Sequence, residues 1–200
     1  MKTQREQHDQ SICTLWKKGV QRSLARRSMG RALAVLARRV SGVPRGGALY
    51  ERPTSVCLVW GAAEGDSELT AFDNALLKAG IGHLNLIAVT SIFPEGAKLA
   101  SLPQIPTGTL TPTVYAKMVS ETPGEVVSAC IGVGVTSKGG VLMEAHGPWT
   151  ASEIEARVTK MVEEGMRVRG LEPYELHFAT AEHRVDRIGS AVAAAVLWRG

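Results

Sequence analysis

Two carboxylates stand where a helix and a strand could turn them toward a substrate. Asp73 follows Leu69 by four residues and precedes Leu76 by three, so it borders the apolar stripe of a helix instead of its solvent face. Glu144 lies in a strand segment that is otherwise apolar. Because strand side chains alternate, Glu144 either sits on the exposed face or points into a pocket. In a pocket, desolvation would raise its pKa and make it a proton donor.

Familiar catalytic motifs are missing from the chain. It contains no HExxH, GxSxG or GxxxxGK[ST] pattern. The five histidines lack the spacing of metal ligands, so we expect no metal site. The glycine-bounded segment 61–65 has no lysine for a phosphate and is predicted to connect a strand to a helix. Thr90 and Ser91, taken alone, are typical of a strand end.

The elements that would hold these residues alternate between strand and helix. The helix around Asp73 begins after Asp66 or Ser67, ends before Gly80, and has an apolar stripe that includes Leu69 and Leu76. The predicted elements are a strand at 55–60, a helix at 68–79, a strand at 83–92, a long proline-rich loop, a strand at 125–135 with a hairpin partner at 141–146, a helix opened by Thr150, a strand at 174–182, and an alanine-rich segment at 188–198 that is either a strand or a buried helix. This order predicts a mixed α/β or α+β sandwich.

Charge divides the chain of 200 residues into two parts. Residues 1–54 hold 12 Lys and Arg against 3 Asp and Glu, whereas residues 55–200 hold 11 against 16. We therefore expect a basic N-terminal extension and linker at 1–54, poorly ordered or partly helical, ahead of one domain at 55–200. No run of 18 apolar residues could span a membrane, and three widely spaced cysteines favour a reducing, cytoplasmic location.

Several motifs in the second part occur together, in order and with similar gaps. They are the Asp73 helix, segments 79–82, 85–87, 90–94 and 142–144, and the tail from Glu182-His183 to Trp198. Together they resemble the pyruvoyl-dependent arginine decarboxylases of the archaeal type. The resemblance covers residues 55–200 and leaves 1–45 without a counterpart. Two positions depart conservatively from the pattern: Thr90, where some members have Ser, and Phe93, where Met is also seen.

The resemblance implies a proenzyme with a layered αββα sandwich, as in the pyruvoyl-dependent histidine and arginine decarboxylases. The chain would cut itself between Thr90 and Ser91, when the serine hydroxyl attacks the preceding carbonyl and forms an ester. β-Elimination and hydrolysis would then leave a covalent pyruvoyl group in place of Ser91. That group would accept the electrons released when carbon dioxide leaves L-arginine, giving agmatine for polyamine biosynthesis.

The same resemblance assigns roles to four other residues. Glu144 corresponds to the proton donor, and Asp73 to the carboxylate that receives the substrate guanidinium. Leu76 is expected to contact the substrate, and Asn85 corresponds to an asparagine needed for self-cleavage. In a regular strand, Asn85 and Ser91 would be roughly 20 Å apart, so Asn85 would serve a neighbouring protomer. That agrees with the assembly that the resemblance implies, a homotrimer of processed protomers or a multiple of it, with sites between subunits.

Two other interpretations stay open on the sequence. The first is a pyruvoyl enzyme for histidine or lysine, because Asp73 favours a cationic side chain without selecting arginine. The second is an unprocessed, non-catalytic homologue whose basic arm binds an anionic partner such as nucleic acid or lipid. We expect neither nucleic acid nor membrane as a partner of the core.

Overall fold

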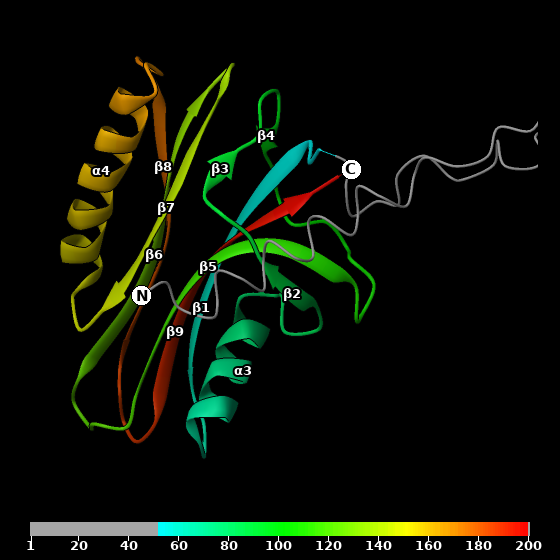
Figure 1. The fold of residues 1–200 in the computed structure, drawn as a ribbon. Coiled ribbons are helices and arrows are strands. Elements are labelled where there is room, and N and C mark those ends of the chain that lie inside the picture. The colour runs from blue at the N-terminus through cyan, green and yellow to red at the C-terminus, as the bar shows by residue number, and fades with distance from the viewer. Residues whose placement is uncertain (1–51, 200) are drawn as a thin grey trace, which may run out of the picture. The chain divides into compact units, whose positions relative to one another are not determined.

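Residues 52–199 are described by the computed structural model, and they form four layers in the order helix, sheet, sheet, helix (Figure 1). The predicted α+β sandwich is confirmed. The expectations about the basic arm fall almost entirely on residues 1–51, outside the described residues. The elements in chain order are β1 (Ser55–Glu64), α3 (Glu68–Lys78), β2 (Asn85–Ala88), β3 (Ile92–Phe93), β4 (Lys98–Leu99), β5 (Leu110–Ser120), β6 (Val126–Thr136), β7 (Gly139–Gly147), α4 (Ala151–Val168), β8 (Glu175–Arg184) and β9 (Gly189–Trp198).

Sheet A has five strands in the order β2-β5-β9-β1-β4. The alanine-rich segment left open by the sequence is its central strand, β9, which pairs antiparallel with β1 from Ser55↔Trp198 to Glu64↔Gly189. The strand predicted to end at 60 therefore continues to Glu64, and the prediction that 61–65 is a connection is wrong. The prediction for the segment that forms β5 is a second error. The sequence analysis assigned the first residues of this segment to the proline-rich loop and predicted no strand in the remainder.

Sheet B has four strands in the order β3-β7-β6-β8, all antiparallel. The predicted hairpin is confirmed: β6 pairs with β7 from Ser128↔Gly147 to the turn at Thr136↔Gly139. β3 pairs with β7 only at Ile92↔Val141 and Phe93↔Gly140. Beyond Val141, toward Gly147, this edge of β7 has no strand beside it in the described chain.

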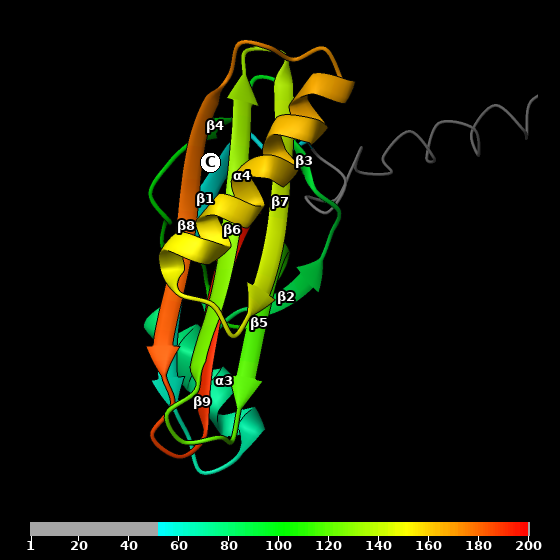
Figure 2. The ribbon, with the colours of Figure 1, turned by 90° about the vertical axis from the view of Figure 1, so that its left-hand side faces the viewer.

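Three hydrophobic clusters hold the layers together. The largest lies between the two sheets and includes Phe93, Val114, Ile131 and Leu142. A second packs α3 against sheet A, and a third packs α4 against sheet B, where Figure 2 shows α4 lying across the strands. β9 contributes buried side chains to both sides of sheet A, which explains why its sequence shows neither strand nor helix periodicity.

Both helices have the predicted caps. Ser67 caps α3 and shares a capping box with Thr70, while Thr150 caps α4 and shares one with Glu153. The helix that Thr150 was predicted to open thus begins at Ala151. None of the described helices is long and apolar enough to cross a membrane.

The predicted apolar stripe of α3 needs correction. The side chains buried against sheet A are Ala71 and Ala75, followed by the cap residue Ala79. Leu69, predicted to belong to the buried stripe, is 75% exposed, and Leu77 is 57% exposed. Small side chains face the sheet because the helix lies very close to it: a Cβ at Gly61 would stand 2.5 Å from backbone atoms of α3. The larger leucines therefore point away from the sheet.

The prediction of one regular strand at 83–92 is also wrong. The chain pairs with β5 in sheet A as far as Ala88, leaves that sheet, and enters sheet B at Ile92. The apolar residues of this segment serve two different sheets, which a single hydrophobic run cannot reveal. Thr90 and Ser91 lie on the crossover between the sheets.

Candidate active site

The crossover brings Ser91 against Glu144, 53 positions away in the sequence. The Ser91 hydroxyl donates a hydrogen bond of 3.1 Å to Oε2 of Glu144. The backbone fixes this contact, because the Leu142 N–H donates to the Ser91 carbonyl at 3.0 Å. Leu142 is buried in the core between the sheets, and Glu144 follows it two residues along the same strand face. A nucleophile and a proton acceptor thus meet at hydrogen-bond distance.

The peptide bond before Ser91 is held in a tight turn. The N–H of Ile92 donates to the carbonyl of Thr90 at 3.1 Å, an i to i+2 contact with Ser91 at its centre. A hydrogen bond to this oxygen withdraws electron density from the carbonyl carbon that the Ser91 hydroxyl would attack. Sequence reasoning missed the Ile92 amide, since a backbone group at a sheet crossover carries no side-chain signal.

The sequence left open whether Glu144 lies on an exposed face or points toward a pocket. It lies on the same face of sheet B as core residue Leu142, yet its side chain is exposed in the described chain. The carboxylate is therefore accessible to a small molecule and at the same time in contact with Ser91.

Asn85 is not part of this contact. Its side-chain amide donates to the carbonyl of Gly108 at 2.8 Å. The backbone of Asn85 pairs with Leu110, the first residue of β5. Gly108 has a φ of 81°, a backbone conformation that glycine adopts without strain. The four residues of β2 put roughly 10 Å of extended chain between Asn85 and the crossover.

Asp73 and Leu76 lie on α3, which packs against β1, β9 and β5 on the outer face of sheet A. Leu76 is partly buried beside sheet A, whereas Asp73 is exposed and has no hydrogen-bond or ion-pair partner among the described residues. α3 makes no substantial contact with β3 or β7. Within one chain, the structure does not bring Asp73 and Leu76 together with Ser91 and Glu144.

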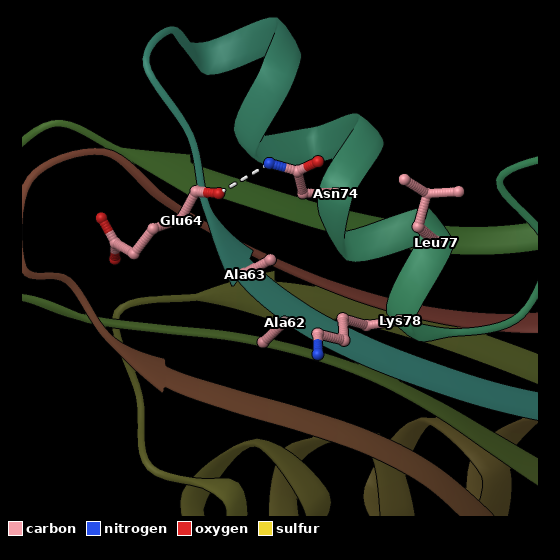
Figure 3. Close-up of a pocket in the computed structure, with 6 residues that line it drawn as sticks. All are labelled: Ala62, Ala63, Glu64, Asn74, Leu77 and Lys78. Atoms are coloured by element: carbon pink, nitrogen blue, oxygen red, sulfur yellow. Dashed lines mark hydrogen bonds between the residues drawn. The ribbon is translucent and has the colours of Figure 1, made fainter.

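A cavity of about 580 Å³ also lies at α3, between this helix and the end of β1 (Figure 3). Its wall includes Asn74, which donates to the carbonyl of Glu64 at 2.9 Å, and the side chains of Leu77 and Lys78. None of the predicted site residues lines it. Ala62, Ala63 and Glu64 of β1 complete its lining.

Comparison with known proteins defines the class. The family model described as pyruvoyl-dependent arginine decarboxylase matches residues 55–199, and the chain belongs to this family. The family's name implies a covalently bound pyruvoyl group.

Individual relatives agree with this assignment. The chain is 42% identical over 154 residues to the pyruvoyl-dependent arginine decarboxylase of Methanocaldococcus jannaschii, covering 76% of this chain and 93% of that protein. It is 45% identical over 154 residues to the enzyme of the same name from Pyrococcus abyssi, covering 74% of this chain and 98% of that protein. The relative from Methanococcus maripaludis strain C5 is 42% identical over 152 residues.

Proposed function

We propose that this protein cuts itself between Thr90 and Ser91 and then decarboxylates L-arginine to agmatine and carbon dioxide. The observation that carries the proposal is the hydrogen bond from the Ser91 hydroxyl to Glu144. It joins the one side chain able to attack the Thr90 carbonyl to a group able to accept its proton. Membership of the family and the names of its relatives supply the substrate.

In the self-cleavage step, each group near the crossover has a separate task. Glu144 accepts the proton as the Ser91 oxygen attacks the carbonyl carbon of Thr90, and returns it to the Ser91 nitrogen as the C–N bond between Thr90 and Ser91 breaks to leave an ester. The Ile92 N–H stabilises negative charge that develops on the Thr90 oxygen. The Leu142 N–H holds the Ser91 carbonyl in place, so the attacking oxygen keeps its position.

The pyruvoyl group, once formed from Ser91, supplies a carbonyl that takes up the substrate amine and accepts the electron pair released with carbon dioxide. Glu144 stands beside this position and is the group that delivers a proton to the substrate α-carbon. Asp73 binds the guanidinium, for which a carboxylate offers two parallel hydrogen bonds. Leu76 packs against the methylenes of the substrate.

These roles require more than one copy of the chain. Asp73 and Leu76 lie on the outside of sheet A, while Ser91 and Glu144 lie where the chain enters sheet B. Leu69 and Leu77 are exposed on α3, close to Asp73. Two further exposed apolar residues, Val89 and Ile92, lie at the crossover itself.

We propose that α3 of one copy covers the crossover of the next in a homotrimer. Two different apolar surfaces then meet head to tail, which closes into a ring when the rotation is threefold. This arrangement brings Asp73 of one copy to Ser91 and Glu144 of its neighbour. It also makes Asn85 available to a site other than that of its own chain.

Intact-mass analysis of purified protein tests the central step. We expect a fragment 1–90 and a fragment that begins at position 91 and is lighter by one ammonia than the same fragment with a free serine. The Ser91→Ala protein should stay whole, because it lacks the attacking hydroxyl. A homogeneous species of 21.4 kDa without decarboxylase activity would overturn the proposal.

A further inference from the structure

His146 lies two residues after Glu144 on β7, on the same face of the strand. The pairing of this segment with β6 is regular, since Glu144 is opposite Ile131 and His146 is opposite Ala129. Both Ile131 and Ala129 belong to the core between the sheets, which fixes the face on which Glu144 and His146 stand. Both side chains are exposed in the described chain.

The backbone around His146 is held from the opposite face of the strand. Gly147 allows the Trp149 ring to pack on the strand, since a Cβ there would stand 2.4 Å from that ring. Arg157 of α4 lies 4.1 Å from the centre of the Trp149 ring. The Gly147 carbonyl accepts a hydrogen bond from the buried Ser128 hydroxyl. The imidazole is thus carried on a fixed strand end.

Glu144 is the ionisable side chain that shares the His146 face of β7. β2, β3 and β6 contain no charged residue, and β7 contains no ionisable side chain besides these two. The single charged residue of β5, Lys117, faces α3, where its ammonium lies 4.2 Å from the Phe72 ring. Among the described residues, no hydrogen-bond or ion-pair partner occupies the His146 ring.

Decarboxylation consumes a proton in every turnover. The bond to the departing carboxylate is replaced by a bond to hydrogen, so the α-carbon gains one proton for each carbon dioxide released. Glu144 holds only one such proton and is left ionised after delivering it. It must regain a proton from water before the next substrate can react.

We propose that His146 relays this proton, passing an imidazolium proton to the Glu144 carboxylate and replacing it from water. The proposal rests on the function proposed above, in which Glu144 is the proton donor. His146 itself does not touch the reacting carbon. It acts through Glu144, so it is a positioning and relay residue of the site.

The placement can be tested without any turnover, in the Ser91→Ala protein, which cannot form the pyruvoyl group. With isotope-labelled histidine, NMR records the ring signals of each histidine at one fixed pH, and the His146→Gln variant identifies the His146 signal. Glu144→Gln should move the His146 signal, because Glu144 is its neighbour two residues along the same strand face. His177, which lies 3.3 Å from Glu175, is the matched control and its signal should not move. An unchanged His146 signal would overturn the proposal.

The relay is tested in the processed enzyme. His146→Gln should lower kcat for arginine about tenfold, leave KM and self-cleavage unchanged, and be rescued by free imidazole. His177→Gln should resemble the wild type. A rate loss that imidazole does not restore, or no rate loss, would overturn the relay while arginine decarboxylation stands. Wild-type protein that is inactive toward arginine would overturn the proposed function instead, with the NMR result unaffected.

Discussion

Asp73→Asn tests whether a second copy of the chain completes the arginine site. In the described chain Asp73 is exposed and has no partner. A guanidinium bound to an exposed carboxylate gains no more than about 1 kcal/mol, which corresponds to about fivefold in kcat/KM. If α3 is covered by a neighbouring copy, the pair loses contact with water. Removing one partner of such a pair costs roughly 2 to 3 kcal/mol, which corresponds to about 30- to 150-fold.

The assay compares agmatine formation with self-cleavage in the same preparation. Asp73→Asn should reduce kcat/KM for arginine at least 30-fold, while cleavage at Thr90-Ser91 proceeds. Asp66→Asn is the matched control, because Asp66 is also exposed near the start of α3 and pairs with Arg187 at 2.9 Å. That variant should retain arginine turnover. Lysine and histidine serve as alternative substrates in the same assay.

Three results would refute parts of this reasoning. A loss of less than about fivefold would place the guanidinium on an exposed surface, against the proposed cover by a second copy. Equal loss of turnover and self-cleavage would make Asp73 a structural residue. Faster turnover of histidine or lysine than of arginine would change the substrate while leaving the pyruvoyl chemistry in place.

Three further predictions concern assembly and stability. Unprocessed Asn85→Ala and Ser91→Ala proteins, mixed under conditions of subunit exchange, should regain cleavage that neither has alone, since a mixed interface holds one complete site; exchange without cleavage would place Asn85 in its own chain's site. Gly61→Ala should lower the free energy of unfolding by about 1 to 3 kcal/mol in denaturant titrations, because its Cβ would meet the backbone of α3. Partial burial raises the pKa of Glu64, but hydrogen bonds from His183 and three backbone N–H groups outweigh it and bring the pKa to about 2. The ionised form therefore stabilises the fold above the ordinary carboxyl pKa, and this contribution fades as pH falls toward 2, so Glu64→Gln should destabilise the protein at pH 7 and match the wild type near pH 2.

Local signals in the sequence were sufficient for both helices. Ser67 and Thr150 begin α3 and α4 because each side chain satisfies a backbone N–H of the first turn. The hairpin of β6 and β7 was also predictable, since two apolar runs flank a short polar turn. These features depend on neighbours within a few positions, which the sequence shows directly.

The errors lie where distant parts of the chain decide the structure. Gly61 was interpreted as the end of β1, yet the strand continues because a glycine is what the close approach of α3 requires. Pro112 was interpreted as loop, but β5 begins before it. The proline is tolerated there because pairing of β5 with β9 begins only at Thr113.

In the candidate site, too, some features follow from neighbouring residues and others from distant parts of the chain. Ser91 and Glu144 were proposed from a resemblance, and the structure explains their proximity by the sheet crossover that the sequence did not reveal. His146 had a signal that could have been used, because a spacing of two on a strand puts it on the face of Glu144. No spacing rule connects Asp73 to Ser91, since one chain holds them on opposite sides of sheet A.

α3 offers the strongest argument that the described chain is incomplete as a catalytic unit. Its alanines already fill the narrow space beside sheet A, so Leu69 and Leu77 have no place in the core of their own chain. A helix that is apolar on two faces is expected to be covered on both. The exposed leucines flank Asp73, and the exposed apolar residues of the crossover flank Ser91. Covering either group with the other would bury apolar surface and would bring in Asp73, the carboxylate proposed to bind the guanidinium, so the same contact that stabilises the proposed assembly would complete its proposed active site.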